Sequence, residues 1–158
     1  MRLALLDDYQ GVAVGMADWA SESALSVTAF REPVADLEDL VAMLAPFQAV
    51  MMMRERTPFP AALLERLPRL RLIVTAGMAN AALDLAAATR LGIQVCGTRT
   101  WPHATPELAL GLMLAVARRI PQEAAGMKAG RWQQSVGMGL HGRTLGLIGL
   151  GNIGRRMA

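Results

Sequence analysis

Five short apolar runs separated by helix-length segments are the feature that most constrains the fold of this chain. The runs are Leu3–Leu6, Leu25–Phe30, Ala49–Met53, Leu72–Ala76 and Ile93–Cys96. Continuous apolar runs of this length are typical of strands that are covered on both faces. Because parallel strands need long crossover connections, the alternation predicts an α/β fold with a doubly wound parallel sheet.

The segments between these runs carry helix signals. Val34–Leu44 places Leu37, Leu40 and Leu44 at helical spacing, and Pro46 follows it. The other predicted helices are Gly11–Ala20, Pro60–Leu67 and Leu83–Leu91, the last with Gly92 at its C-terminal cap. Each predicted crossover of residues 1–98 therefore contains a helix.

The pattern changes after Thr98. Residues 99–104 are predicted to be a linker, and a helix is expected from the N-cap Thr105, with Pro106 first, to Arg119. That helix is apolar nearly all round, so we expect it to be buried on several sides. A second helix is expected at Gln122–Ala129, and a further strand at Thr144–Ile148 after a loop.

A glycine motif follows that last predicted strand. Gly149, Gly151 and Gly154 form the pattern G-x-G-x-x-G, with Asn152 and Ile153 between the second and third glycines. The first glycine permits a tight turn, the second lets a pyrophosphate approach the backbone, and the third lets helix and strand pack closely. The motif predicts dinucleotide binding at residues 149, 151, 152, 153 and 154, and a glycine-rich turn without a ligand is the alternative.

Composition limits the class of protein and its partners. Residues 1–98 have a net charge of −3 and residues 99–158 one of +6, so an anionic ligand is possible, but no basic run exceeds two residues and nucleic acid is not expected. The sole cysteine, Cys96, offers no disulfide and no zinc cluster, and no metal site is predicted. The longest apolar run, Leu108–Ala117, is too short for a bilayer. We expect a cytoplasmic protein without a membrane segment.

Four stretches in a fixed order give the chain a family resemblance. They are Met51–Thr57, Leu70–Leu85, Thr105–Pro121 and Gly142–Arg155. In this order the chain resembles the N-terminal half of the D-isomer-specific 2-hydroxyacid dehydrogenases. The resemblance implies a flavodoxin-like substrate-binding domain at 1–98, a hinge at 99–104, and at 105–158 a helix and the first β-α unit of an incomplete Rossmann NAD(P)-binding domain.

The resemblance also implies a reaction and partners. The family transfers a hydride between NAD or NADP and a small 2-hydroxy or 2-oxo acid, and the region of residues 105–158 implies a homodimer. A non-catalytic flavodoxin-like interaction or regulatory module derived from the family is the alternative.

Individual residues match the family's substrate loop. Gly77, Met78 and Ala79 occupy the loop whose N–H groups bind the substrate carboxylate, and Arg54 matches the substrate-side residue after the third strand. Ala79 and Ala81 stand where a glycine and an aspartate are usual. The family's catalytic arginine, histidine and glutamate lie beyond residue 158, so no catalytic residue is expected here. We expect the 158 residues alone to be inactive and to bind dinucleotide weakly.

Overall fold

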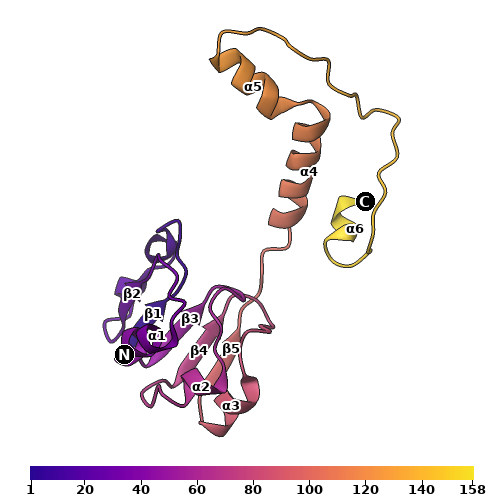
Figure 1. Ribbon diagram of the computed structural model, residues 1–158. Coiled ribbons are helices and arrows are strands. Elements are labelled where there is room, and N and C mark those ends of the chain that lie inside the picture. Colours follow the sequence, from indigo (N-terminus) through magenta and orange to yellow (C-terminus); the bar gives the residue numbers. More distant parts are fainter. The chain divides into compact units, whose positions relative to one another are not determined.

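The computed structural model describes residues 1–158 and divides into two compact units, Met1–Thr100 and Trp101–Ala158. The first unit contains β1 (Arg2–Leu5), β2 (Ser26–Ala29), β3 (Ala49–Met52), β4 (Leu72–Thr75) and β5 (Gln94–Gly97). They form one parallel sheet in the order β2-β1-β3-β4-β5 (Figure 1). This is the flavodoxin-like order, in which the direction of winding reverses between β1 and β3. The predicted doubly wound parallel sheet is confirmed.

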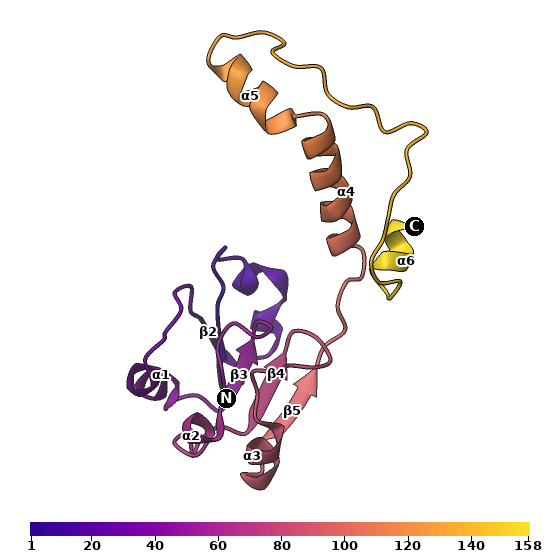
Figure 2. The same ribbon diagram turned by 45° about the vertical axis from the view of Figure 1, so that its right-hand side comes forward.

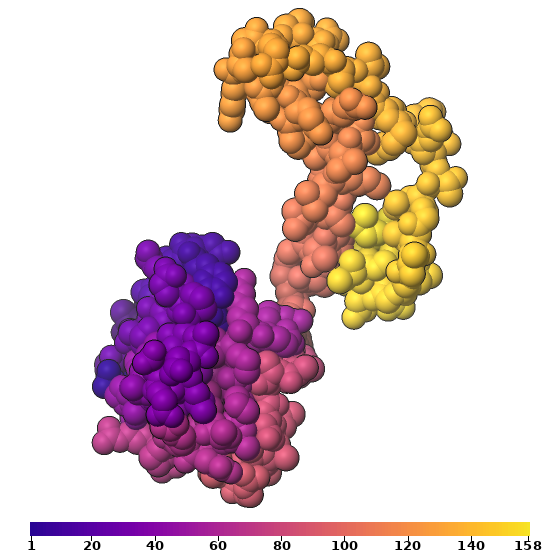
Figure 3. Space-filling model, viewed as in Figure 1, coloured from indigo at the N-terminus to yellow at the C-terminus, as the bar shows by residue number.

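Three helices cover one face of the sheet, and the main core lies beneath them. They are α1 (Leu37–Leu44), α2 (Ala61–Leu64) and α3 (Leu85–Arg90) (Figure 2). Their buried leucines and alanines pack on Ala4, Val50 and Ile73, whose side chains leave the strands on this face. Figure 3 shows the first unit, Met1–Thr100, as one dense body.

The other face of the sheet carries two short 3₁₀ turns, η1 (Ala13–Met16) and η2 (Trp19–Ser21). The helix expected over Gly11–Ala20 is therefore wrong. Local polar groups compete with a continuous helix: the Asp8 carboxylate accepts from the N–H groups of Val12 and Ala13, and the Asp18 carboxylate accepts from Ser21 N–H. The indole of Trp19 donates to the Ala13 carbonyl at 3.2 Å and ties the two turns together.

One backbone pairing lies outside the sheet and joins the segments that follow β3 and β4. Phe59 and Leu83 form an isolated parallel bridge. The N–H of Phe59 donates to the Ala82 carbonyl at 2.7 Å, and the N–H of Asp84 donates to the Phe59 carbonyl at 3.0 Å. The Phe59 ring is fully buried in the core. The bridge therefore anchors both segments to the core.

The second unit contains α4 (Ala104–Ala117), α5 (Ile120–Lys128) and α6 (Gly154–Met157). α4 begins after His103, so the predicted N-cap at Thr105 is wrong. Pro106 occupies the third helical position, which is tolerated because the first-turn N–H groups have no partners within the helix. Arg119, at φ +54°, separates α4 from α5. No helix of the chain has the length and apolar character needed to cross a bilayer.

Two expectations for this unit are not met. Residues 144–148 form no strand, because a parallel strand is stabilised by neighbouring strands and the second unit contains none. α4 is not buried on several sides, since Leu108 is 63% and Val116 78% exposed. Glu123, in the first turn of α5, accepts from two residues that follow the helix, from Ser135 Oγ at 2.6 Å and from Gln134 N–H at 3.1 Å. These bonds hold the pKa of Glu123 below its ordinary value.

Candidate functional site

The carboxyl ends of β3, β4 and β5 bring the predicted substrate residues of the first unit together. Arg54 follows β3, the loop at Gly77 follows β4, and Thr98 follows β5. In an open parallel sheet this edge is where ligands bind, since loops of neighbouring strands diverge there and leave a crevice.

The loop at Gly77 presents two backbone N–H groups without partners. Gly77 has a φ of +109°, and its own N–H donates to Thr98 Oγ1 at 3.2 Å. In return the N–H of Thr98 donates to the Gly77 carbonyl at 3.2 Å, so β5 fixes the start of the loop. The N–H groups of Met78 and Ala79 donate to nothing in the chain, and both residues are exposed. Adjacent free N–H groups of this kind can bind a carboxylate.

Arg54 lies beside this loop. Its Nη1 donates to the Ala76 carbonyl at 3.2 Å, while its Nε lies 3.7 Å from a Glu55 carboxylate oxygen. A Cβ atom on residue 77 would lie 2.2 Å from that Nη1, so the guanidinium occupies space that only a glycine leaves free. The side chain is half exposed and retains free N–H groups. The structure thus places a cation next to the two unpartnered N–H groups.

Asn80 is part of this arrangement, although it was not among the predicted site residues. Its Nδ2 donates to the Arg54 carbonyl at 2.7 Å and to Thr75 Oγ1 at 3.0 Å. Its Oδ1 accepts from the N–H of Ala82 at 2.9 Å. The only available signal was one polar side chain in an otherwise apolar loop.

A second group of polar contacts, which was not predicted, joins the loop after β1 to the segment after β3. Asp7 is buried at φ +58°, and its carboxylate accepts from the hydroxyls of Thr57 at 2.9 Å and Tyr9 at 3.4 Å. The guanidinium of Arg56 donates to the Asp7 carbonyl at 2.9 Å and lies 4.5 Å from the centre of the Tyr9 ring. These contacts fix the turn that carries Arg54.

The glycine motif of the second unit forms a turn that leads into α6. Gly149 has a φ of +90°. A Cβ atom on Gly154 would lie 2.2 Å from the Gly149 carbonyl oxygen, so no side chain fits there. The N–H of Arg155 donates to the Gly151 carbonyl at 3.0 Å, and a Cβ on Gly151 would meet nothing within 4 Å. A close turn with an open middle glycine suits the pyrophosphate of a dinucleotide.

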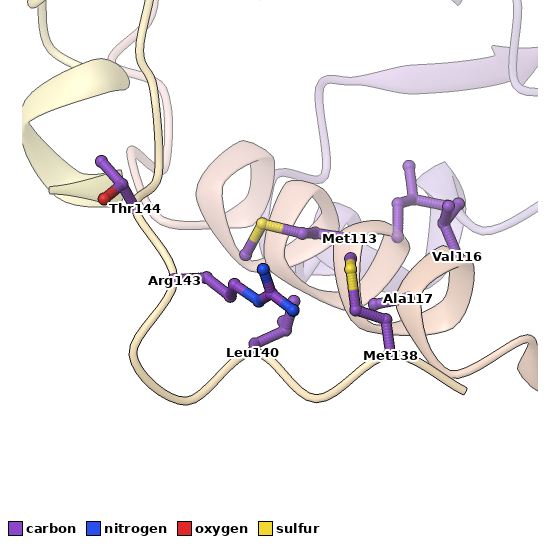
Figure 4. Close-up of a pocket in the computed structure, with 8 residues that line it drawn as sticks. Met113, Val116, Ala117, Met138, Leu140, Arg143 and Thr144 are labelled. Atoms are coloured by element: carbon purple, nitrogen blue, oxygen red, sulfur yellow. The ribbon is translucent and has the colours of Figure 1, made fainter. Parts of the chain in front are cut away.

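A cavity of 580 Å³ also lies in the second unit (Figure 4). Residues of α4 form one side, and the extended segment of residues 138–144 forms the other. The lining is Leu112, Met113, Val116, Ala117, Met138, Leu140, Arg143 and Thr144. With one cation and no acid or histidine, this lining offers an apolar groove rather than a set of reacting groups. His103 and His141 take no part in it.

The family comparisons cover most of the chain. Residues 16–133 match the catalytic domain of the D-isomer specific 2-hydroxyacid dehydrogenases, and residues 110–158 match the NAD binding domain of the same family. The chain belongs to this dehydrogenase family. The resemblance carried by the four sequence stretches is thereby confirmed.

Known dehydrogenases of this family agree in sequence and in fold. The chain is 38% identical over 124 residues to D-3-phosphoglycerate dehydrogenase of Homo sapiens, covering 77% of this chain and 23% of that one. It is 37% identical over 127 residues to hydroxypyruvate reductase of Thermotoga maritima, covering 77% and 40%. A crystal structure of phosphoglycerate oxidoreductase from Vibrio cholerae superposes with a TM-score of 0.91 at 39% identity, covering 99% of this chain and 51% of that one. The chain therefore spans at most about half the length of these dehydrogenases.

Proposed function

We propose that the whole protein is an NAD- or NADP-dependent oxidoreductase that transfers a hydride at the second carbon of a small 2-hydroxy or 2-oxo acid. In this proposal residues 1–98 are the substrate-binding domain, residues 99–104 the hinge, and residues 105–158 the start of a Rossmann domain. One observation carries it: two unpartnered N–H groups, at Met78 and Ala79, lie beside the guanidinium of Arg54 at the carboxyl edge of the sheet.

The substrate would bind by its two ends. Its carboxylate accepts from the N–H groups of Met78 and Ala79, and Gly77 supplies the turn that exposes them. Hydrogen bonds from N–H groups to a charged acceptor contribute about 1.5–3 kcal/mol each. Arg54 then meets an anionic group at the far end of the substrate. The name of the phosphoglycerate dehydrogenase relatives is consistent with such a group.

The dinucleotide would bind at the glycine turn. The backbone of Gly149, Gly151, Asn152, Ile153 and Gly154 would hold its pyrophosphate, and the absence of a side chain at Gly154 keeps the turn closed. When bound, the nicotinamide supplies or accepts the hydride. The chain's own residues hold the substrate by its carboxylate and far end, which fixes the orientation of its second carbon.

Residues 1–158 alone should neither catalyse the reaction nor bind dinucleotide tightly. The resemblance assigns the proton-transferring histidine, its glutamate and the carboxylate-binding arginine to positions after residue 158. In this chain His103 precedes α4 and His141 lies in an exposed turn. The glycine turn by itself contacts the pyrophosphate and leaves the adenosine ribose unbound.

We also propose a homodimer through residues 105–158. Large apolar side chains of α4 are exposed, which a single soluble unit rarely tolerates over a continuous surface. They are Leu108, Leu110, Leu112, Leu114 and Val116. The apolar groove beside the same helix adds to this surface. A second copy of α4 would remove such side chains from water.

The test is an assay of the whole protein, with residues 1–158 measured in parallel. NADH or NADPH oxidation is followed with glyoxylate, hydroxypyruvate and pyruvate. Arg54→Ala should raise the KM for the preferred substrate at least tenfold. The control variant Arg66→Ala, which removes an exposed arginine just after α2, should leave this KM unchanged. No turnover with any 2-oxo acid would contradict the proposal and favour a non-catalytic module.

A further inference from the structure

The side-chain amide of Asn80 is oriented by its neighbours. The Arg54 carbonyl can only accept a hydrogen bond and the Ala82 N–H can only donate one. The oxygen of the amide must therefore face Ala82, at 2.9 Å, and the nitrogen must face Arg54, at 2.7 Å. Both hydrogens of the nitrogen are used, because the second is donated to Thr75 Oγ1.

This amide connects the turn after β3 to the loop after β4. Arg54 adopts φ +57°, a left-handed conformation that is unfavourable for a residue with a side chain and needs support from its surroundings. Asn80 holds its backbone carbonyl, while the Ala76 carbonyl holds its guanidinium. Both contacts come from the segment that also carries the free N–H groups of Met78 and Ala79.

No other side chain between Gly77 and Leu83 can do this. The intervening residues besides Asn80 are a methionine and three alanines, and alanines stand at 79 and 81, where the family resemblance leads one to expect a glycine and an aspartate. We infer that Asn80 is a positioning residue, which sets Arg54 at the distance from the Met78 and Ala79 N–H groups that a substrate with anionic groups at both ends requires. This inference rests on the proposed function.

The inference predicts a selective effect. A ligand with a carboxylate and a distal phosphate must contact both the loop N–H groups and the Arg54 guanidinium, so it depends on their relative position. A ligand without the phosphate needs only the loop N–H groups. Loss of the Asn80 bridge should therefore weaken binding of 3-phosphoglycerate more than binding of D-glycerate. We expect the preference for 3-phosphoglycerate to fall about tenfold, the equivalent of one hydrogen bond to a charged group.

Amide NMR titrations of residues 1–158 with these two ligands test it. Asn80→Asp is the main variant, because it keeps the size and the acceptor for Ala82 N–H but has no proton to donate to the Arg54 carbonyl. Asn80→Ala removes all three bonds. Gln48→Ala is the matched control, since Gln48 also joins two backbone segments, accepting from Arg2 N–H and donating to the Pro46 carbonyl, at the opposite edge of the sheet.

The expected result is that both Asn80 variants lose the preference for 3-phosphoglycerate and shift the ligand-free amide signals of Met78 and Ala79, while Gln48→Ala does neither. A wild-type preference in Asn80→Asp, or unchanged loop signals in its ligand-free spectrum, overturns the positioning role while the proposed function stands. If the wild-type Met78 and Ala79 signals respond to neither ligand, the inference fails, whereas the proposed function is decided separately by turnover of 2-oxo acids by the whole protein.

Discussion

Gly97, at the end of β5, is the position where one added methyl group should disturb the substrate loop directly. A Cβ atom on this residue would lie 2.9 Å from the Met78 Cα and 3.0 Å from the Gly77 carbonyl oxygen. Ordinary contact begins at 3.4 Å, so Gly97→Ala must push the loop by about 0.5 Å. Both neighbours are backbone atoms, and neither can rotate away as a side chain would.

The expected loss of stability in Gly97→Ala follows from the hydrogen bonds that fix the loop at this point. The Gly77 carbonyl and N–H are both bonded to Thr98, the residue after Gly97, so a shift strains these bonds as well. Overpacking of this kind destabilises a domain by about 1–3 kcal/mol. For a unit of this size each kcal/mol lowers Tm by about 4–8 °C.

Urea unfolding and the amide NMR signals of Met78 and Ala79 measure the two effects. Gly15→Ala is the control, because Gly15 lies in the same unit and a Cβ there would meet nothing within 4 Å. We expect Gly97→Ala to lose stability, to move both loop signals and to weaken glyoxylate binding about tenfold or more. If Gly97→Ala is as stable as Gly15→Ala and leaves the loop signals in place, the packing argument is wrong.

Three further predictions concern the core, the surface charges and association. Phe59→Ala should cost about 3–5 kcal/mol in urea unfolding, since it empties a fully buried site, and a loss below about 1 kcal/mol would contradict the core assignment. The hydrogen bond from Arg66 lowers the pKa of Glu38 from 4.5, so the pair stabilises the fold above that pH, and this contribution is lost as pH falls through the lowered pKa. The difference in unfolding free energy between wild type and Glu38→Gln should therefore shrink between pH 6 and pH 3. A difference that stays constant with pH would show that the pair is not formed. Leu108→Glu with Val116→Glu on exposed positions of α4 should convert a dimer to a monomer in light scattering without changing the unfolding of the first unit, whereas a wild-type monomer would refute the dimer.

Most of the first unit could be predicted from its sequence, because its strands are apolar runs and its helices lie between them. All five predicted strands form, with ends that differ by at most one residue. The exception lies at residues 11–20, where carboxylates of Asp8 and Asp18 bond to nearby N–H groups and replace a helix by two short turns. Such side-chain competition depends on exact geometry and leaves the apolar pattern unchanged.

The second unit was less predictable because its elements depend on contacts beyond their own sequence. Residues 144–148 have the composition of a strand, but a strand is stable only beside another one. The site residues Arg54, Gly77, Met78 and Ala79 could be named from the resemblance, and their roles stay predictions. Asn80 could not be found, because its three partners are 26, 5 and 2 residues away and meet only in the folded chain.

The Phe59–Leu83 bridge has a consequence for how this loop can change over time. The loop is fixed at its start by Thr98 and at its far end by the bridge, so the number of residues between Gly77 and Leu83 is set by the distance between two anchors in the core. Insertion or deletion of one residue would break an anchor, whereas exchange of the small exposed side chains would not. Divergence of substrate preference at this edge should therefore proceed by substitution at constant loop length, and a library for redesign should vary residues 78–81 without changing their number.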